Sequence, residues 1–342
     1  MTHEFIQIVQ GYKKAKKAGR KSILVTLVAL DGSSYRPSGV RMLVVDDASM
    51  IGVISGGCVE KEILKQTGSV FTSKVSKIMT YDGRYRLGCE GLLYILLEPF
   101  GPSDLFLKEF ENNILKEESF QLKTYFKKEV GTNTEWGTEV VFTDNSRYYM
   151  KQNRTMVLGS NSDVLVKEMN PCFKLVIFGA ERDAAQLCIF AKLLGWKVTV
   201  VVSISNPLTL QHFPGANEIF HVEPESIETI HLNKNSAVIL MTHSYARDLK
   251  YLSKLKEFSV SYIGLLGPKK RREKLLNEFI ELHSVIEDSF FDLIHGPSGL
   301  NIGAETPQEI ALSICSEILS VVRGKEPIFL SDKVNAIHCE IS

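Results

Sequence analysis

The sequence predicts an α/β protein with an N-terminal mixed α/β domain and a C-terminal Rossmann-type parallel-sheet domain. From Phe173 onward, short apolar runs alternate regularly with helical patterns, as in a parallel sheet covered by helices. Before that point, strand and helix patterns follow one another without this alternation. The length of 342 residues is enough for two domains.

Composition narrows the class of protein. The 40 basic and 40 acidic residues give a net charge of zero, which argues against a nucleic-acid binder. No run of about 20 apolar residues is present, so we expect no membrane span. The N-terminus lacks a signal-peptide core, and the six cysteines form no CxxC pair. We therefore expect a cytoplasmic protein with reduced thiols and without a zinc ribbon or iron–sulfur cluster.

The first 100 residues carry patterns for helices and short strands. Phe5, Ile8 and Tyr12 follow helical spacing and predict an opening helix over 5–18. Apolar β-branched runs predict strands, and the pair of acids at Asp46 predicts a hairpin turn. The predicted strands are 22–30, 41–45, 50–54, 77–81 and 92–97, and a second helix is predicted over 59–65.

The segment 101–170 is interpreted as an insert or linker made of a helix and a β-meander, with no catalytic constellation. It is expected to be a structural insert or a dimer contact. The predicted helix is 104–116, and the predicted strands are 120–130, 138–143 and 147–151. The domains expected on either side are 1–100 and 171–325, and the tail is 326–342.

The C-terminal domain has the length of one Rossmann unit, about 150 residues. A basic run at 269–272 is interpreted as a solvated helix face. The predicted strands are 174–178, 197–202, 237–241, 260–264 and 291–294, and the predicted helices are 183–194, 245–256, 268–279 and 307–322.

The stretch Ser55-Gly56-Gly57-Cys58-Val59-Glu60 is the strongest candidate site. It joins a predicted strand to a predicted helix, and its glycines let a ligand approach the backbone. Free N–H groups at a helix start favour negative charge, so a cysteine there should be a reactive thiolate. A tight turn before a buried, inert cysteine explains the hexapeptide equally well. Glycines, arginines and thiols together suit a ligand with a phosphate and a soft metal or sulfur centre. The residues grouped with this turn are Ser33, Ser34, Arg36, Arg41, Gly88 and Cys89.

The start of the Rossmann domain departs from the dinucleotide-binding fingerprint. Gly179 opens the turn in the right context, but Glu181 replaces the second glycine, and Arg182 follows it. The acid expected about 20 residues later falls near Val202-Ser203 and is missing. We therefore interpret this domain as a scaffold and expect no useful NAD binding.

A glycine-rich stretch near the C-terminus follows the last predicted strand. His295, Gly299 and Glu305 are candidate site residues, because ligands bind at the carboxyl ends of such strands. Thr306 and Glu309 have the spacing of a helix-capping pair, and capping is the preferred role for Glu309.

Four of these stretches resemble the XdhC/CoxI family of xanthine dehydrogenase accessory factors. In the N-terminal domain they are 32–42 (GSSYRPSGVRM) and 52–60 (GVISGGCVE). In the C-terminal domain they are 264–267 (GLLG) and 295–311 (HGPSGLNIGAETPQEIA). The resemblance extends over roughly 5–100 and 171–323, and two long motifs in the right order are a specific signal.

The resemblance implies a protein that binds the molybdenum cofactor (molybdopterin) transiently and assists its sulfuration and insertion. The implied recipient is a xanthine dehydrogenase-type molybdenum hydroxylase, a cysteine desulfurase is the second implied partner, and a homodimer is expected. Such a protein is a cofactor-maturation chaperone rather than a self-contained enzyme. The alternative is an NAD(P)-dependent oxidoreductase, against which Glu181 and the missing acid argue.

The resemblance also implies roles for particular residues. Cys58 would contact the molybdenum or relay sulfur. Cys89 is a second candidate for this role, although Glu90 stands where the family pattern has a further glycine. The residues expected to bind the cofactor are Ser33, Ser34, Arg36, Arg41, Ser55, Gly56, Gly57, Gly179, Arg182, His295, Gly299 and Glu305.

Overall fold

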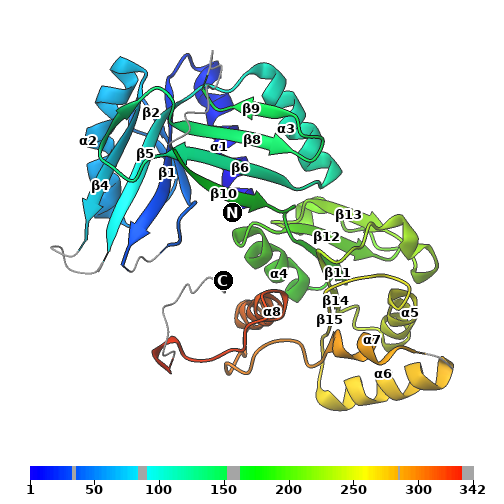
Figure 1. Ribbon diagram of the computed structural model, residues 1–342. Coiled ribbons are helices and arrows are strands. Elements are labelled where there is room, and N and C mark those ends of the chain that lie inside the picture. The colour runs from blue at the N-terminus through cyan, green and yellow to red at the C-terminus, as the bar shows by residue number, and fades with distance from the viewer. Residues whose placement is uncertain (33–35, 84–90, 152–161, 284–285, 333–342) are drawn as a thin grey trace. The chain divides into compact units, whose positions relative to one another are not determined.

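The chain folds into two compact units (Figure 1). Each unit has its own hydrophobic cores. The first unit contains the described residues of 1–171 together with 330–332, and the second contains those of 172–329. Among the residues described, no helix has both the length and the apolar character needed to cross a membrane. The residues that the computed structural model describes are 1–32, 36–83, 91–151, 162–283 and 286–332.

The first unit is built on two antiparallel sheets. The strands of the first sheet, in spatial order, are β3 (Met50–Gly52), β2 (Arg41–Val45), β1 (Ser22–Asp31), β5 (Leu92–Phe100), β4 (Ser76–Asp82) and β7 (Gly131–Asn133). Those of the second sheet are β10 (Asp163–Met169), β6 (Phe120–Phe126), β8 (Gly137–Phe142) and β9 (Arg147–Tyr149).

Strand β1 is buried on both of its faces, which explains why it reads as a continuous apolar run. Ile23 and Val25 belong to a core shared with Val59 and Ile63 of α2 (Gly57–Ser73). Leu24, between them, points to the opposite face and packs in a different core. Helix α2 is therefore held against one face of the first sheet.

Residues of the predicted insert share the core that contains Leu24. Phe106 of α3 (Asp104–Lys116) and Phe120 of β6 pack with Phe5 of α1 (Thr2–Lys17). The predicted helix and meander are present, but their aromatic side chains complete the core under β1. The segment is thus an integral layer of this unit.

The second unit has a six-stranded, wholly parallel sheet, which confirms the predicted Rossmann-type domain. The strand order, 3-2-1-4-5-6 within the unit, is that of dinucleotide-binding domains. In space the strands are β13 (Glu218–His221), β12 (Lys197–Val202), β11 (Lys174–Phe178), β14 (Ser236–Leu240), β15 (Tyr262–Leu265) and β16 (Ile294–His295).

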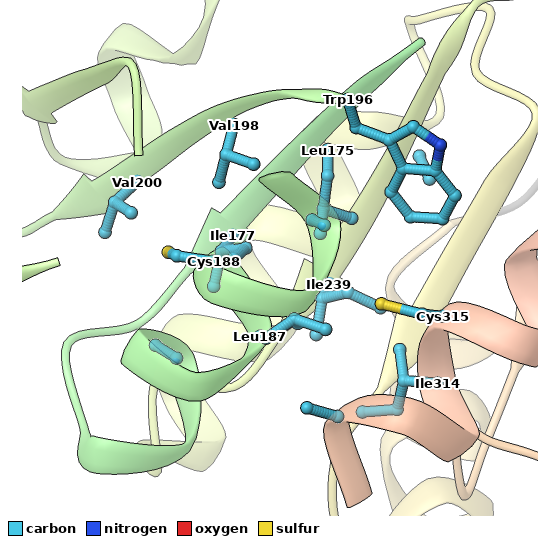
Figure 2. Close-up of a cluster of buried hydrophobic side chains, with 14 of the residues drawn as sticks. Leu175, Ile177, Leu187, Cys188, Trp196, Val198, Val200, Ile239, Ile314 and Cys315 are labelled. Atoms are coloured by element: carbon cyan, nitrogen blue, oxygen red, sulfur yellow. The ribbon is translucent and has the colours of Figure 1, made fainter. Parts of the chain in front are cut away.

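Helices cover both faces of this parallel sheet. One face packs against α4 (Arg182–Leu193) and α8 (Pro307–Val322) in a core that includes Cys188 and Cys315 (Figure 2). The other face packs against three helices. These are α5 (Tyr245–Leu255), α6 (Lys269–Leu282) and α7 (Asp288–Asp292). Short 3₁₀ turns lie at Leu210–His212, Pro224–Thr229 and Leu330–Asp332.

Several element predictions need correction, among them the strand predicted at 120–130, which ends at Phe126. The strand predicted at 291–294 is wrong, because Phe290 stacks on Phe279 as part of helix α7, and only Ile294–His295 pairs as β16. Helix α2 runs over 57–73 instead of 59–65, since buried residues continue along its core-facing side. Strands β7, β10 and β13 are additional to the predicted elements; none of them contains the continuous apolar run typical of the central strands.

We predict that Gly179→Ala destabilises the second unit by about 2–3 kcal/mol, because overpacking adds to backbone strain. Gly179 has φ 149°, and a Cβ there would lie 2.3 Å from the Met241 carbonyl oxygen. Gly303→Ala is the matched control, since Gly303 also has a positive φ, 74°, but open space around it. Denaturant unfolding would measure both; equal losses in the two variants would contradict the prediction.

Candidate functional site

The turn before α2 is open on its outer side. Gly56 is the N-cap of the helix in an extended conformation and has no side chain to accept from the first N–H groups. Gly56, Gly57 and Cys58 are all exposed, and a Cβ on either glycine would meet no atom within 4 Å. The exposed Cys58 thiol excludes the alternative of a buried, inert cysteine. The turn therefore presents a thiol and a helix start to solvent.

Glu60 supports the turn from its buried side. Its Oε1 atom accepts hydrogen bonds from the backbone N–H groups of Ile54 and Ser55, at 3.0 Å each. Its Oε2 atom is buried and has no hydrogen-bond partner among the described residues. This glutamate closes the sequence motif but is absent from the predicted site residues. An acid one turn after a glycine N-cap is the sequence signal that could have indicated its role.

Arg36 is tied to the strand end that leads into this turn. Its guanidinium donates to the Val53 carbonyl oxygen at 2.6 Å and pairs with the Glu4 carboxylate of α1, also at 2.6 Å. About a quarter of the side chain, 26%, is exposed. Arg36 thus holds the chain before the turn, and part of its side chain stays exposed.

Arg41 lies inside the unit. Its guanidinium donates to the Gly39 carbonyl oxygen at 2.8 Å and to the Thr124 hydroxyl at 3.1 Å. Thr124 contacts Thr138, whose N–H and hydroxyl both donate to the buried Glu98 carboxylate. Burial lowers the pKa of Arg41 to about 10, against the opposing effect of Glu98, so it stays charged at neutral pH. A side chain with 6% exposure is not available on the surface beside Cys58.

Three of the predicted site residues, Ser33, Ser34 and Cys89, lie outside the described residues, as does Gly88. Their roles remain predictions. Ser55 itself is half-buried at the start of the turn.

In the second unit, Gly179 and Arg182 lie at the point where the strand order reverses. Gly179 ends the segment after β11, and its backbone packs against that of Met241, which follows β14. Glu181 is the exposed N-cap of α4, and Arg182 is its exposed first residue. The close approach of two strand ends is a structural reason for the glycine, independent of any ligand.

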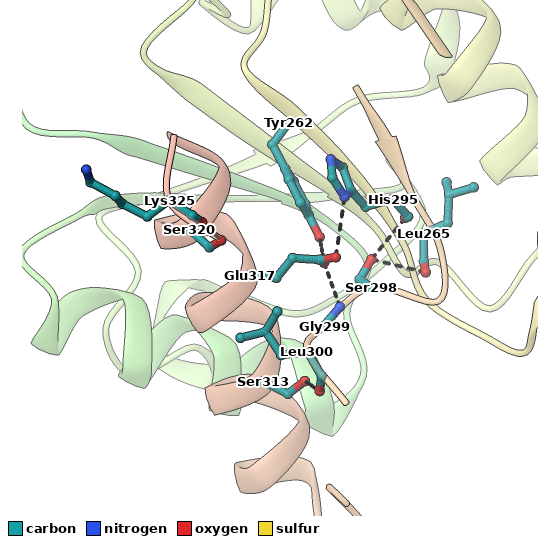
Figure 3. Close-up of polar contacts among 10 residues, drawn as sticks. All are labelled: Tyr262, Leu265, His295, Ser298, Gly299, Leu300, Ser313, Glu317, Ser320 and Lys325. Atoms are coloured by element: carbon teal, nitrogen blue, oxygen red, sulfur yellow. Dashed lines mark hydrogen bonds and ion pairs between the residues drawn. The ribbon is translucent and has the colours of Figure 1, made fainter. Parts of the chain in front are cut away.

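His295 belongs to a hydrogen-bonded group between β15, β16 and α8 (Figure 3). Its Nδ1 atom lies 3.3 Å from a carboxylate oxygen of Glu317, and its ring stacks on Tyr262 with centroids 4.5 Å apart. Glu317 also accepts from the Tyr262 hydroxyl and, at 2.7 Å, from the Gly299 N–H. The group joins the edge strand to the helix that covers it.

Burial and hydrogen bonding together shift the pKa values of Glu317 and Tyr262. Burial opposes ionisation of Glu317, but hydrogen bonds from His295, Tyr262 and Gly299 outweigh it, so the pKa of Glu317 is lowered. Burial and the Glu317 carboxylate both raise the pKa of Tyr262. Neither Tyr262 nor Glu317 is among the predicted site residues. A tyrosine opening a strand and a glutamate within an apolar helix carry no distinctive sequence signal.

Gly299 and Glu305 have different surroundings. Gly299 has φ 114°, and a Cβ there would lie 2.3 Å from the Ser313 hydroxyl of α8, so no side chain fits. Glu305 is exposed, and its backbone N–H donates to the Glu309 carboxylate at 2.9 Å. The capping box of Thr306 and Glu309 is present, which confirms the capping role predicted for Glu309.

The predicted solvated face at 269–272 is only partly correct. Arg271 pairs with the buried Asp248 carboxylate at 2.7 Å, and Asp248 also accepts from Thr242. The Arg272 side chain packs over Gly296. These two arginines therefore stabilise the ends of neighbouring strands, whereas Lys269 and Lys270 are exposed.

The candidate residues are divided between the two units, and only those of the first unit around the turn before α2 form one group. Ser55, Gly56, Gly57 and Cys58 lie together, with Arg36 connected to them through the preceding strand end. Those of the second unit lie at separate places: Gly179 and Arg182 at the turn between β11 and α4, His295 and Gly299 beside Glu317 of α8, and Glu305 just before α8. Within the described ranges, no set of three or more His, Cys, Asp or Glu side chains is arranged to hold a metal ion.

Together the units define a two-domain α/β protein with an open glycine–cysteine turn and a Rossmann-type second domain. Residues 15–82 match the model of the XdhC and CoxI family, and residues 175–318 match that of the XdhC Rossmann domain. The chain therefore belongs to the XdhC and CoxI family, as the sequence motifs predicted.

Two relatives extend over nearly the whole chain. A protein of Bacillus subtilis (strain 168), named as a probable subunit of xanthine dehydrogenase, is 26% identical over 318 residues, covering 87% of this chain and 92% of that protein. The molybdenum cofactor insertion chaperone PaoD of Escherichia coli (strain K12) is 25% identical over 329 residues, covering 94% and 90%. A crystal structure described as a xanthine dehydrogenase from Bacillus halodurans shares the fold, with a TM-score of 0.76, 23% identity and coverage of 96% and 98%.

We predict that Cys58 is alkylated by iodoacetamide in the native protein at neutral pH, while Cys188 and Cys315 react only after unfolding. Cys58 is exposed, whereas burial raises the pKa of each of the other two thiols to about 12. Peptide mapping by mass spectrometry after timed labelling would measure this. Native labelling of Cys188 or Cys315 at the rate of Cys58 would contradict the described core.

We also predict that Glu317→Gln lowers the free energy of unfolding by an amount that depends on pH. The lowered pKa means that the carboxylate stabilises the fold above pH 4.5, its ordinary value, and loses this contribution as pH falls through the folded-state pKa. At pH 7 the free energy of unfolding of the variant should be about 2 kcal/mol lower than that of wild type, the usual contribution of hydrogen bonds to a charged group. Denaturant unfolding of both proteins at several pH values would measure this. The difference between their free energies of unfolding should shrink as the pH is lowered from neutral to acid, and a difference that does not change with pH would contradict the prediction.

Proposed function

We propose that this protein binds the molybdenum cofactor as cargo, holds it for sulfuration and helps to insert it into a xanthine dehydrogenase-type molybdenum hydroxylase. The observation that carries the proposal is the exposed Cys58 at the open, glycine-capped start of α2. The cargo would be bound transiently, and the chain would act as a maturation chaperone in the cytoplasm. A cysteine desulfurase as sulfur donor and a homodimer of the chain belong to the same proposal.

The residues at the turn fit the chemistry of this cargo. The cofactor has a phosphate, a polar pterin and a metal bound by sulfur. Open space at Gly56 and Gly57 allows a ligand to approach the backbone, and the N–H groups of the helix start favour a phosphate. A cysteine thiolate is a soft ligand for a metal. Arg36 is a partly exposed arginine tied to the strand end before the turn, whereas Arg41 is buried and is left out of the proposed phosphate site.

The names of the two relatives support the same function. One is named for insertion of the molybdenum cofactor, and the other for membership in xanthine dehydrogenase. Their alignments with this chain extend across both units. A role in supplying the cofactor to such an enzyme agrees with both names.

For the second unit we propose a scaffold role. Its strand order is that of dinucleotide-binding domains, but the exposed Glu181 is the N-cap residue of α4, at the helix start where a pyrophosphate would bind. A negative side chain at that position disfavours a negative ligand. NAD(P)-dependent oxidation is therefore the weaker candidate function.

We predict that the purified wild-type protein, incubated with molybdenum cofactor and then desalted, retains molybdenum and pterin in equal amounts. Elemental analysis would measure the metal, and fluorescence of the oxidised pterin would measure the organic part. Cys58→Ser should lower retention about 10-fold or more, since a thiolate ligand is lost. The variant should also fail to restore activity to a cofactor-free hydroxylase.

Cys172→Ser is the control, because Cys172 is a second cysteine of the chain that lies outside the turn. It should retain the cofactor at the wild-type level. Absence of both molybdenum and pterin from the wild-type protein would refute the proposed function. Full retention of the cofactor by Cys58→Ser would show that Cys58 is not needed for cofactor binding.

A further inference from the structure

We infer that Glu60 is a positioning residue for the cofactor-binding turn, an inference that rests on the proposed function. Helices commonly begin with a side chain that accepts hydrogen bonds from the first N–H groups. Helix α2 begins with Gly56 instead and has no such side chain. Glu60 supplies a carboxylate from inside the first turn of the helix and directs it backward, toward the strand end.

The Glu60 carboxylate holds the strand side of the turn, and a backbone hydrogen bond holds its helix side. The Oε1 atom accepts from the N–H groups of Ile54 and Ser55, the last residues before Gly56. The backbone N–H of Val59, on the other side, donates to the Gly56 carbonyl oxygen at 2.8 Å. Ile54 is fully buried in the core that also holds Val59. The turn is therefore fixed from behind, and its outer side remains free for a ligand.

The unpaired oxygen of Glu60 argues that this residue serves more than folding. The residue is only 7% exposed, and Oε2 has no partner among the described residues. A buried carboxylate with an unpaired oxygen is costly for stability. A serine or aspartate as N-cap would fix the helix at lower cost, but its side chain would occupy the N–H groups that face a ligand. Support by Glu60 keeps those groups free.

The test compares Glu60→Ala and Glu60→Gln with the control Glu62→Ala. Glu62 is an acid of the same helix whose carboxylate contacts Lys65 and Gln66 at the surface. Loss of the carboxylate in Glu60→Ala should speed hydrogen exchange at the Ile54 and Ser55 amides about 10-fold. It should also lower retention of added molybdenum cofactor about 10- to 100-fold, the usual effect of removing a residue that orients a ligand.

Glu60→Gln separates positioning from charge. The amide oxygen of glutamine can still accept from both backbone N–H groups, so exchange and cofactor retention should stay close to wild type. The control should match wild type in both measurements. Loss of retention in Glu60→Gln with unchanged amide exchange would overturn the inference, because the charge and not the hydrogen bonds would then matter.

Failure of the inference can be told apart from failure of the proposed function. If wild type retains cofactor and Cys58→Ser does not, but Glu60→Ala retains it fully, the positioning role is refuted and the function stands. If wild type retains none, both are refuted. If Glu60→Ala does not fold, amide exchange at Ile54 and Ser55 in Glu60→Gln is read together with its cofactor retention. Faster exchange with unchanged retention would then refute the positioning role.

Discussion

The burial of β1 on both faces is the constraint on which the first unit depends. One face, through Ile23 and Val25, holds α2, and the other, through Leu24, holds α1, α3 and the second sheet. Because α2 is pressed against the sheet along its length, its first turn has a fixed position at the end of β3. The exposed Cys58 is thus presented by a rigid helix, while the glycines before it keep the backbone accessible.

Two arginines that look equivalent in the sequence have separate roles in this arrangement. Arg41, on β2 of the first sheet, donates to Thr124 of the second sheet, and Thr124 contacts Thr138, which donates to Glu98, so the charge of Arg41 is used for internal hydrogen bonding. Arg36 lies at the edge of the unit, where it connects α1 to the strand end before the turn. A buried, hydrogen-bonded charge stabilises one packing arrangement, whereas an exposed one can also meet a ligand.

The second unit shows how glycines and buried charges shape strand ends without forming a nucleotide site. Gly179 and Gly299 permit close contacts, with Met241 and Ser313 respectively, that no other residue permits. Asp248 with Arg271, and Glu317 with His295, join helices to neighbouring strands at the sheet. The dinucleotide-type strand order is retained, but Glu181 stands at the helix start where a pyrophosphate would bind.

The sequence by itself determined the fold class, the strand–turn–helix at Cys58 and the capping box at Thr306, because hydrophobic periodicity and cap spacing are local properties. It also determined the family, through long motifs. Only the tertiary structure decided that Arg41 is buried, that Glu60 supports the turn and that Glu317 orders His295. Each of these depends on which strands and helices become neighbours. The same type of charged residue can lie on a solvated face of a sheet or helix or on a buried one. The local sequence does not distinguish these two positions.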